Sequence, residues 1–185
     1  MTNQKSEHDN LLDRIIGMEL EMFQAVREEQ PSLCKDMPET FKVMRRMTHS
    51  VLSNKTLELY LKDLLQATTN RRNLMTEKYA RMDSLIPCLN TNPVIEGIVR
   101  VEHRWREELA NKYPQMFRIQ SIQVFDLYLY SELETYSGQT LELYFKDISD
   151  AAKEGRNLVE ERYTFLSRLL GYNSIDDWVE KQASE

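Results

Sequence analysis

The chain has 185 residues, of which 41% are hydrophobic and 29% are charged, and it contains 5 Gly and 5 Pro. This composition is typical of a compact helical domain with its own hydrophobic core, and it argues against a disordered chain. The formal net charge of −6 gives no general attraction for phosphate backbones or anionic lipid surfaces, so neither nucleic acid nor a membrane is expected as a partner.

The polar segment 1–10 is expected to be disordered, and a single all-helical domain is expected over residues 11–175, with a frayed C-terminus over 179–185. No apolar run approaches the roughly 20 residues of a membrane span, and the opening segment does not resemble a secretory signal. The sequence therefore favours a cytoplasmic protein.

Apolar residues recur at the spacing of one face of an α-helix along most of the chain. In the first part they predict helices near residues 12–26, 38–52, 57–67 and 75–86. In the second part they predict helices near residues 95–109, 125–136, 141–151 and 159–170. The segment 173–178 is expected to form a short capped turn or helix. No strand pattern competes, so the fold class is predicted to be all-α.

Particular residues predict where these helices begin and end. Pro31 and Pro114 are expected to close the first helix of each part, because the residue before a Pro is pushed out of the helical region. Thr56 and Thr140 each precede the first apolar residue of a helix, so both are expected to be N-caps.

Gly155 predicts a left-handed break between the last two long helices of the second part, followed by a cap at Asn157 with Glu160 three residues later. Arg71 stands at the matching place in the first part. The break there is expected to be either tighter or merely a kink.

Three blocks of sequence recur in the same order. Ile15 to Glu19 is echoed by Ile98 to Glu102, at an offset of 83. Thr56 to Asp63, which reads TLELYLKD, returns as TLELYFKD at Thr140 to Asp147, at an offset of 84. The tripeptide RNL then recurs at that second offset. A shared order and spacing within one chain indicate an internal repeat.

The repeats divide the predicted domain. Repeat one is expected at 11–86, a linker at 87–93 and repeat two at 94–172. Equivalent apolar stripes need equivalent burial, so the domain is predicted to be a compact, bundle-like assembly of two tandem diverged repeats with pseudo-two-fold symmetry.

Glu19 and Glu102 are the most informative polar residues, because each lies within an apolar stripe. Both follow an Ile by four residues and precede a large apolar residue by three, which points their carboxylates toward the core. A carboxylate in that place must be hydrogen-bonded, paired or protonated. We expect Arg72 and Arg156 to form ion pairs with these carboxylates, since guanidinium binds carboxylate bidentately.

Other polar residues complete this candidate site. Those that recur in both repeats are Asn73, Asn157, Glu77, Glu161, Tyr60 and Tyr144. Arg45 and Glu132 lie on related helical faces of opposite repeats without being equivalent, so they would make a shared pocket asymmetric.

The network allows three functional interpretations. In the first, it only ties helices together, as buried ion pairs often do. In the second, it lines a polar pocket between the repeats that holds a polar or anionic small molecule, and a desolvated carboxylate would serve as general base if the protein is an enzyme. In the third, the protein is a non-catalytic interaction or regulatory module whose helices offer an apolar groove to a partner. The sequence names no reaction, ligand or oligomeric state.

Several kinds of site lack their residues in this sequence. A di-metal carboxylate protein is the last alternative function. Such a centre in a helical bundle uses Glu-x-x-His motifs, which are absent, and His49 and His103 are too few to supply imidazole ligands, so this alternative is disfavoured and no metal is expected. Cys34 and Cys88 have no neighbouring His or Cys-x-x-Cys spacing, so both are expected to be free thiols. No Gly-rich phosphate loop is present, and no cofactor is expected.

The chain resembles a bacterial family, the domain-of-unknown-function family numbered 4125. The residues that carry the resemblance are Glu19 with Met22 and Phe23, the segments 34–36 and 38–41, and above all the run 72–82, RNLMTEKYARM. The resemblance spans about 11–172 and implies a bacterial helical protein without assigning an activity. The family pattern has Gly before the Arg-Asn pair and Ser-Gln after the Met-Arg pair, where this chain has Arg71 and Met47-Thr48.

Overall fold

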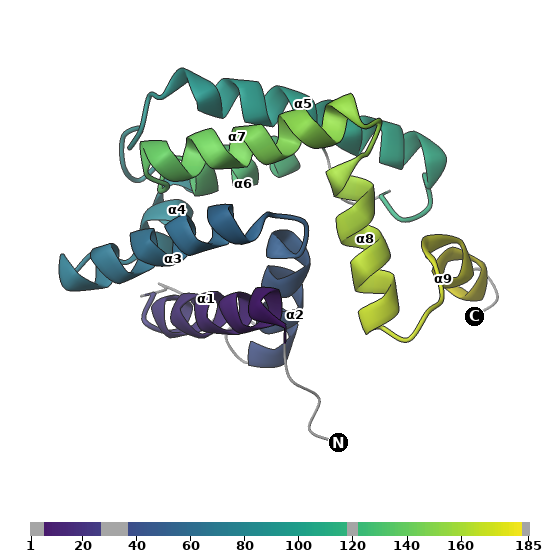
Figure 1. Cartoon of the computed structure of the whole chain (residues 1–185), viewed down its shortest axis with the longest axis horizontal. Helices are drawn as coiled ribbons and strands as arrows, with labels where there is room; N and C mark the ends of the chain where they lie inside the picture. Colours follow the sequence, from purple (N-terminus) through teal and green to yellow (C-terminus); the bar gives the residue numbers. More distant parts are fainter. Residues whose placement is uncertain (1–5, 27–36, 118–121, 183–185) are drawn as a thin grey trace.

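The computed structural model describes residues 6–26, 37–117 and 122–182, and this part is helical with no strand, which confirms the predicted all-α class (Figure 1). The helices are α1 (Glu7–Gln24), α2 (Pro38–His49), α3 (Asn54–Thr69), α4 (Leu74–Met82), α5 (Pro93–Lys112), α6 (Ile122–Leu133), α7 (Gly138–Lys153), α8 (Leu158–Leu169) and α9 (Ile175–Gln182). None of these helices combines the length and the apolar character needed to cross a membrane.

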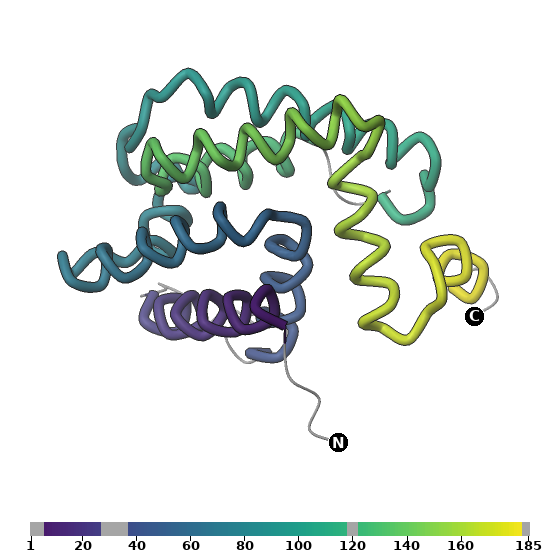
Figure 2. The backbone as a smooth tube through the Cα atoms, viewed as in Figure 1, coloured from purple at the N-terminus to yellow at the C-terminus, as the bar shows by residue number. Residues whose placement is uncertain are grey.

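The helices pack as two interlocked halves, α1–α4 and α5–α8 (Figure 2). In the first half α1 contacts α2, α3 and α4, and in the second half α5 contacts α6, α7 and α8. The main contacts between described helices of the two halves are α3 with α7, α2 with α8, and α4 with α6. Each contact thus has a counterpart when the halves are exchanged, as a pseudo-two-fold relation requires; the relation itself stays a prediction.

Two aspartates tie α3 to α7. Asp63 on α3 accepts hydrogen bonds from the Ser137 backbone N–H at 3.0 Å and the Thr140 hydroxyl at 2.6 Å. Asp147 on α7 accepts from the Ser53 backbone N–H at 2.9 Å and the Thr56 hydroxyl at 2.6 Å. Each half therefore anchors the N-terminus of the other half's long central helix, where a carboxylate also complements the helix dipole.

These contacts correct the predicted N-caps. Ser53 and Ser137 are the caps, and their hydroxyls accept from the backbone N–H groups of Thr56 and Thr140 at 3.3 Å. The capping oxygen bonds the N–H two or three positions into the helix, so a cap stands earlier than the first apolar residue. The threonine hydroxyls instead donate across to the other half.

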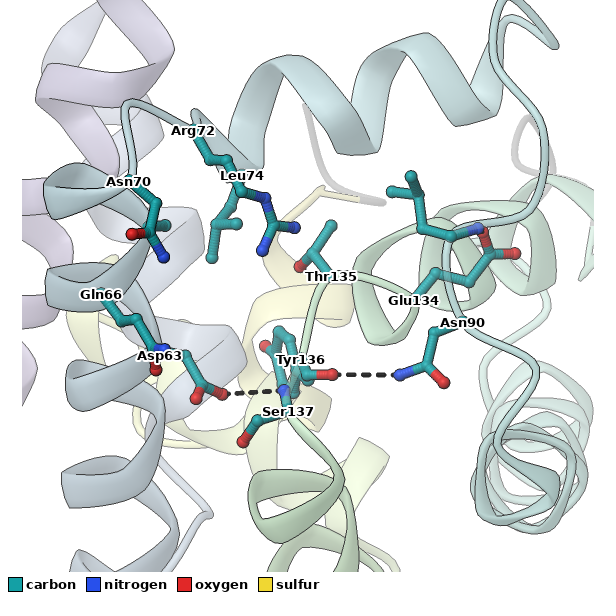
Figure 3. Close-up of a pocket in the computed structure, with 12 residues that line it drawn as sticks. Asp63, Gln66, Asn70, Arg72, Leu74, Asn90, Glu134, Thr135, Tyr136 and Ser137 are labelled. Carbon is teal, nitrogen blue, oxygen red and sulfur yellow. Dashed lines mark hydrogen bonds between the residues drawn. The ribbon is translucent and has the colours of Figure 1, made fainter.

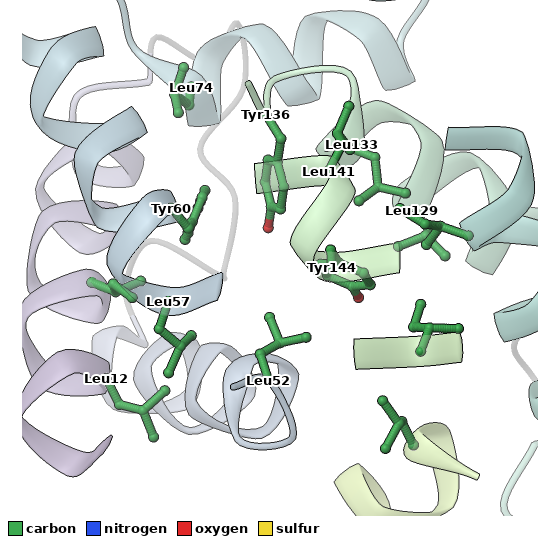
Figure 4. Packing of buried hydrophobic residues seen from close by; sticks show 14 of the residues in the cluster. Leu12, Leu52, Leu57, Tyr60, Leu74, Leu129, Leu133, Tyr136, Leu141 and Tyr144 are labelled. Atoms are coloured by element: carbon green, nitrogen blue, oxygen red, sulfur yellow. The ribbon is translucent and has the colours of Figure 1, made fainter. Parts of the chain in front are cut away.

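One hydrophobic core runs through both halves (Figure 4). Leu57 and Leu141, from α3 and α7, are completely buried, and the rings of Tyr60 and Tyr136 lie 4.5 Å apart between the halves. Because this apolar surface is shared, neither half buries its own stripe without the other.

The break before the last long helix of each half has the same backbone form. Gly155 has φ +70° and Arg71 has φ +56°. Both residues adopt the left-handed backbone conformation, so the helix of the first half is broken there and is not merely kinked. After each break an asparagine, Asn73 or Asn157, caps the next helix through its side-chain oxygen.

The ends of the domain are more helical than expected. The segments 7–10 and 179–182 were predicted to be disordered and frayed, yet they belong to α1 and α9. Ser6 caps α1, and Glu7 and Asp9 in the first turn complement the helix dipole, which explains the earlier start.

Helix α5 ends at Lys112, before Pro114 as predicted. Pro31 and Cys34 lie outside the described residues, whereas Cys88 is exposed and free.

Candidate functional site

Glu19 on α1 is completely buried and lies at the centre of a polar network. Arg45 on α2 binds it bidentately, with Nε and Nη2 at 2.9 and 2.7 Å from the two carboxylate oxygens. The Tyr60 hydroxyl donates to Glu19 at 2.7 Å, and His49 Nε2 lies 3.0 Å from the same oxygen. All four side chains come from the first half.

Arg45 also reaches into the second half, where it binds Glu132 on α6 at 2.9 and 2.8 Å. Lys78 on α4 donates to Glu132 at 2.5 Å, and the Tyr136 hydroxyl donates to it at 2.9 Å. We name these residues together with Glu19, His49 and Tyr60 the Glu19 network. It contains two carboxylates and two fixed cations, so its fixed charges cancel.

The network holds both carboxyls ionised. Burial alone would raise the pKa of the Glu19 carboxyl, but the charge of Arg45 and its hydrogen bonds bring that pKa down to about 2. For Glu132 burial again opposes ionisation, and the charges of Arg45 and Lys78 hold its pKa well below the usual range. Burial raises the pKa of the Tyr60 hydroxyl, which therefore stays protonated and donates.

A smaller network surrounds Glu102 on α5, which is also completely buried. Arg162 on α8 binds it bidentately at 2.6 and 2.9 Å, and the Tyr144 hydroxyl donates to it at 2.7 Å. Arg162 also donates to the Thr48 carbonyl on α2 at 3.1 Å, which links the halves again. We name this set the Glu102 network.

In both networks each buried carboxylate is bound by a cation and by a tyrosine hydroxyl, whereas Nδ1 of the buried His49 has no hydrogen-bond partner among the described residues. Removing one partner of such a pair is costly because it leaves a buried charge unpaired, yet an intact pair does little beyond fixing the structure. The geometry therefore favours the structural interpretation of the two networks.

The predicted partners of Glu19 and Glu102 were wrong. Arg72 binds Glu77 at 2.8 and 2.6 Å, and Arg156 binds Glu161 at 2.7 Å through two nitrogens. Both arginines follow the left-handed break, on the exposed side of the turn, and their side chains are about half exposed. A guanidinium can bind a buried carboxylate, but these two arginines lie on the exposed side of the turn and do not reach Glu19 or Glu102.

Asn73 and Asn157 also lie outside the two networks. Besides capping, they donate to the carbonyls of Met22 and Trp105 at 2.7 and 3.0 Å. Those contacts fix the break against the first helix of each half.

Tyr60 and Tyr144 complete the networks as predicted, since they donate to Glu19 and Glu102. Arg45 and Glu132 were predicted to line a shared pocket, but they bind each other within the Glu19 network and do not line the seam hollow. Glu77 and Glu161 lie toward the surface with their arginines.

Lys78 and Arg162 are the cations that the sequence reasoning missed. They occupy equivalent positions in the two repeats, on the buried face of α4 and α8, at 1% and 6% exposure. A basic residue at the same place in both halves, within an apolar stripe, was the available signal. It was obscured because one half has Lys and the other has Arg.

The surface between the halves contains a hollow of about 280 Å³ (Figure 3). We name it the seam hollow, and it is lined by Asp63, Gln66, Ala67, Asn70, Arg72, Leu74, Leu89, Asn90, Glu134, Thr135, Tyr136 and Ser137. Gln66 and Asn70 lie along its α3 side, and the Arg72 guanidinium is turned toward Thr135. Arg72 is thus the only one of the two predicted arginines in this hollow, and neither Glu19 nor Glu102 lines it.

A second, smaller hollow of about 200 Å³ lies at Arg156. It is lined by Val51, Leu52, Ser53, Asp147, Asp150, Ala151, Arg156 and Leu158. Each of these is related to a residue of the seam hollow by the offset that relates Arg156 to Arg72. Three counterpart pairs differ in residue type. Thr135 and Tyr136 have the apolar counterparts Val51 and Leu52, and Gln66 has the acidic Asp150, which is bound to Lys146 and Lys153.

Comparison with known proteins adds a family to this geometry. Residues 9–181 match the family model described as protein of unknown function (DUF4125). The chain belongs to this family. The match covers α1 to α9 except for the ends, so it includes both networks and both hollows. No curated protein and no solved structure matches the chain.

The described residues around the seam hollow offer hydrogen-bond donors, but they offer no evident metal-binding group or general base. No group of three or more His, Cys, Asp or Glu side chains in residues 6–26, 37–117 and 122–182 is placed to hold a metal ion. Among the lining carboxylates, Asp63 accepts two hydrogen bonds, and Glu134 is bound by Arg81 at 2.6 and 3.0 Å. Burial would raise the pKa of Glu134, but the hydrogen bonds from Arg81 hold it below its usual value. Such a carboxylate is a poor general base.

Arg106 on α5 is a further residue that the sequence analysis did not single out. It is 2% exposed, and its Nη2 has no hydrogen-bond partner in the described part of the chain. Its guanidinium carbon lies 3.7 Å from the centre of the Phe117 ring. Stacking of this kind stabilises a desolvated cation by about 2 kcal/mol, whereas burying an ion costs several kcal/mol. The stacked ring therefore offsets only part of the burial.

Proposed function

We propose that the protein binds a small polar molecule in the seam hollow, and that it acts by binding without chemical conversion. The observation that carries this proposal is the set of unused donors around the hollow. Arg72 uses Nε and Nη2 for Glu77, which leaves Nη1 without a partner among the described residues. The side-chain amides of Gln66 and Asn70 likewise bond to no described residue.

The chemistry of these groups selects an acceptor-rich ligand. A guanidinium nitrogen and two amide groups on one side of a hollow suit a carboxylate or a similar oxygen-bearing group. The carboxylates that line the hollow are already bound by internal donors, so they do not compete for Arg72. The proposed ligand is therefore a small molecule that carries at least one carboxylate or carbonyl oxygen.

The size of the hollow limits the ligand further. Pockets for small molecules and cofactors measure roughly 300–1,000 Å³, and the seam hollow, at about 280 Å³, lies just below that range. A ligand the size of an amino acid or a short organic acid fits this volume better than a dinucleotide does.

We also propose that the two halves derive from one duplicated unit. The constant offset of 84 between lining residues, the exchange of helix contacts and the paired aspartates support this origin. On this view the second hollow at Arg156 is the counterpart of the seam hollow, and the change from Gln66 to Asp150 has altered its chemistry.

The test is a thermal-shift screen of amino acids, mono- and dicarboxylic acids and polyols, followed by calorimetry on any molecule that stabilises the protein. A ligand that binds only the folded state, at 100 times its dissociation constant, adds about 2.7 kcal/mol of stability. Arg72→Gln is expected to weaken binding at least tenfold, because it removes the cationic donor.

Arg156→Gln is the matched control, since Arg156 makes the equivalent surface ion pair beside the second hollow. It is expected to leave binding unchanged. If no molecule of these classes stabilises the protein, or if Arg72→Gln binds as tightly as the wild type, the seam hollow is not a binding site. The interaction-module interpretation would then be the remaining one.

A further inference from the structure

Arg106 occupies an aromatic cage in the second half. Its guanidinium carbon lies 3.7 Å from the centre of the Phe117 ring, 5.8 Å from that of Phe125 and 5.9 Å from that of Tyr163. The three rings come from the turn after α5, from α6 and from α8. We name these four residues the Arg106 cage.

The cage contains no counter-charge. A guanidinium has five N–H donors, yet within residues 6–26, 37–117 and 122–182 Arg106 makes neither a hydrogen bond nor an ion pair. Burial lowers the pKa of Arg106, which is the direction expected when a cation is desolvated without an anion beside it. Asp126 is the carboxylate next to Phe125 in the chain, and it is held by His103 Nδ1 at 2.8 Å.

The other deeply buried arginines differ in this respect. Arg45 binds Glu19 and Glu132, and Arg162 binds Glu102, in each case through two nitrogens. Two buried guanidinium groups are therefore paired with carboxylates, whereas Arg106 is paired with none among the described residues.

The first half shows that packing does not require an arginine here. Phe23 is the counterpart of Arg106, at the same offset that relates Glu19 to Glu102. Its ring stacks on Phe41 at 4.5 Å and lies 5.8 Å from Tyr79, and these two residues are the counterparts of Phe125 and Tyr163. Two of the three rings around Arg106 thus have counterparts that pack against a phenylalanine in the first half, whereas Phe117 has no aromatic counterpart in the sequence.

We propose that Arg106 is the cationic centre of a second binding site, one that receives the oxyanion of a small molecule. Aromatic rings cover the faces of a guanidinium and leave its N–H groups, which lie in the plane, free to bind two oxygens at once. Carboxylate and phosphate share this geometry. The site is independent of the seam hollow, since none of its residues lines that hollow.

The proposed approach for the anion lies past Phe117, because this ring belongs to a turn whereas Phe125 and Tyr163 belong to helices. The Phe117 ring is partly exposed and lies in the turn that follows α5, whereas Arg106 lies in the body of the helix and is 2% exposed. On this proposal, a displacement of the Phe117 ring gives the anion access to the guanidinium. Phe117→Trp therefore places a fluorescent reporter over the site.

The experiment titrates Phe117→Trp with sodium phosphate and, separately, with sodium acetate, each against sodium chloride at equal ionic strength. The expected result is a saturable change in tryptophan fluorescence with at least one of the two anions and none with chloride. Which of the two anions binds more tightly distinguishes a phosphate ligand from a carboxylate ligand. The natural Trp105 and Trp178 are corrected for by parallel titration of the chain with Phe117 intact.

Arg106→Phe, which copies the arrangement at Phe23, is the decisive variant, and Arg106→Leu is a second one should the ring not fit. Both are expected to fold, and, added to Phe117→Trp, to weaken anion binding at least tenfold. Arg72→Gln in the same background is expected to leave it unchanged, which separates this site from the seam hollow. Anion binding that survives both Arg106 variants, or no specific response to either anion, overturns the proposal.

Discussion

Arg45 on α2 donates two hydrogen bonds to Glu132 on α6, at 2.9 and 2.8 Å, and so joins the halves of the chain through a buried ion pair. The same guanidinium binds Glu19 in its own half. Because one cation serves a carboxylate from each half, the halves are fixed in one relative position. Unfolding is therefore expected to be a single cooperative transition, with no stable separate half.

Glu132→Gln tests this connection. The change leaves Lys78 buried at 1% exposure without its carboxylate and halves the negative charge that faces Arg45. The free energy of unfolding is expected to fall by about 3–5 kcal/mol, the usual range when one partner of a buried ion pair is removed. Urea denaturation followed by circular dichroism measures it.

Glu161→Gln is the control for that variant, because Glu161 binds Arg156 at the surface, where both side chains are more than one-third exposed. Exposed ion pairs contribute about 0–1 kcal/mol, so the control is expected to remain within that range of the wild type. Equal losses in the two variants would contradict the account of Glu132 as a buried counter-ion.

The low pKa of Glu19 predicts a specific acid sensitivity. The pKa falls from 4.5 to about 2 on folding, so the folded state binds the proton more weakly than the unfolded state. The stabilisation from Glu19 is therefore complete above pH 4.5 and is lost as the pH falls toward 2. At 1.36 kcal/mol per pH unit, this contribution amounts to roughly 3 kcal/mol.

Thermal unfolding of the wild type and of Glu19→Gln, measured from pH 7 to pH 2, checks this. The variant is expected to be the less stable at neutral pH, and the difference between the two proteins is expected to shrink as the pH falls. A difference that stays constant over the whole range would mean that Glu19 does not titrate with folding.

The sequence predicted the helices and the burial of Glu19 and Glu102 because both follow from the helical period. An apolar stripe fixes which face of a helix is buried, and a carboxylate within it must be buried too. The same reasoning identified Tyr60 and Tyr144, which lie in the stripes of α3 and α7 and bind those carboxylates.

The pairing of each cation with its carboxylate could not be predicted in that way. Helical phase places Lys78 within the apolar stripe of α4, but the packing of α4 on α6 decides that it meets Glu132, and the left-handed turn at Arg71 decides that Arg72 stays outside. Helical phase locates a residue on its own helix, whereas an ion pair depends on two helices at once. The crossing contacts of α2 with α8 and of α4 with α6 are not encoded in any local pattern.

The paired aspartates predict matched effects in the two halves. Asp63→Ala and Asp147→Ala each remove two hydrogen bonds to a carboxylate from the N-terminus of the opposite central helix. Each change is expected to lower the free energy of unfolding by about 2 kcal/mol, as for a hydrogen bond to a charged group. The two losses should agree within about 0.5 kcal/mol and should add in the double variant. Clearly unequal losses in urea denaturation would count against equivalent roles for the two residues.

The left-handed turns predict opposite effects for two complementary substitutions. Arg71 has φ +56°, a conformation that costs a residue with a side chain about 1–2 kcal/mol. Arg71→Gly removes that strain but makes the unfolded chain more flexible, which offsets about 0.4–1 kcal/mol. The free energy of unfolding is therefore expected to rise by roughly 0.5–1 kcal/mol.

Gly155 has φ +70°, and a Cβ there would meet no atom within 4 Å, so the left-handed backbone is the expected cost of Gly155→Arg. The free energy of unfolding of that variant is expected to fall by a similar amount, because both turns need one residue in the left-handed conformation. Thermal unfolding of the two variants and of the double exchange decides the matter: stabilisation by Gly155→Arg, or destabilisation by Arg71→Gly, would show that contacts of the arginine side chain outweigh its backbone strain.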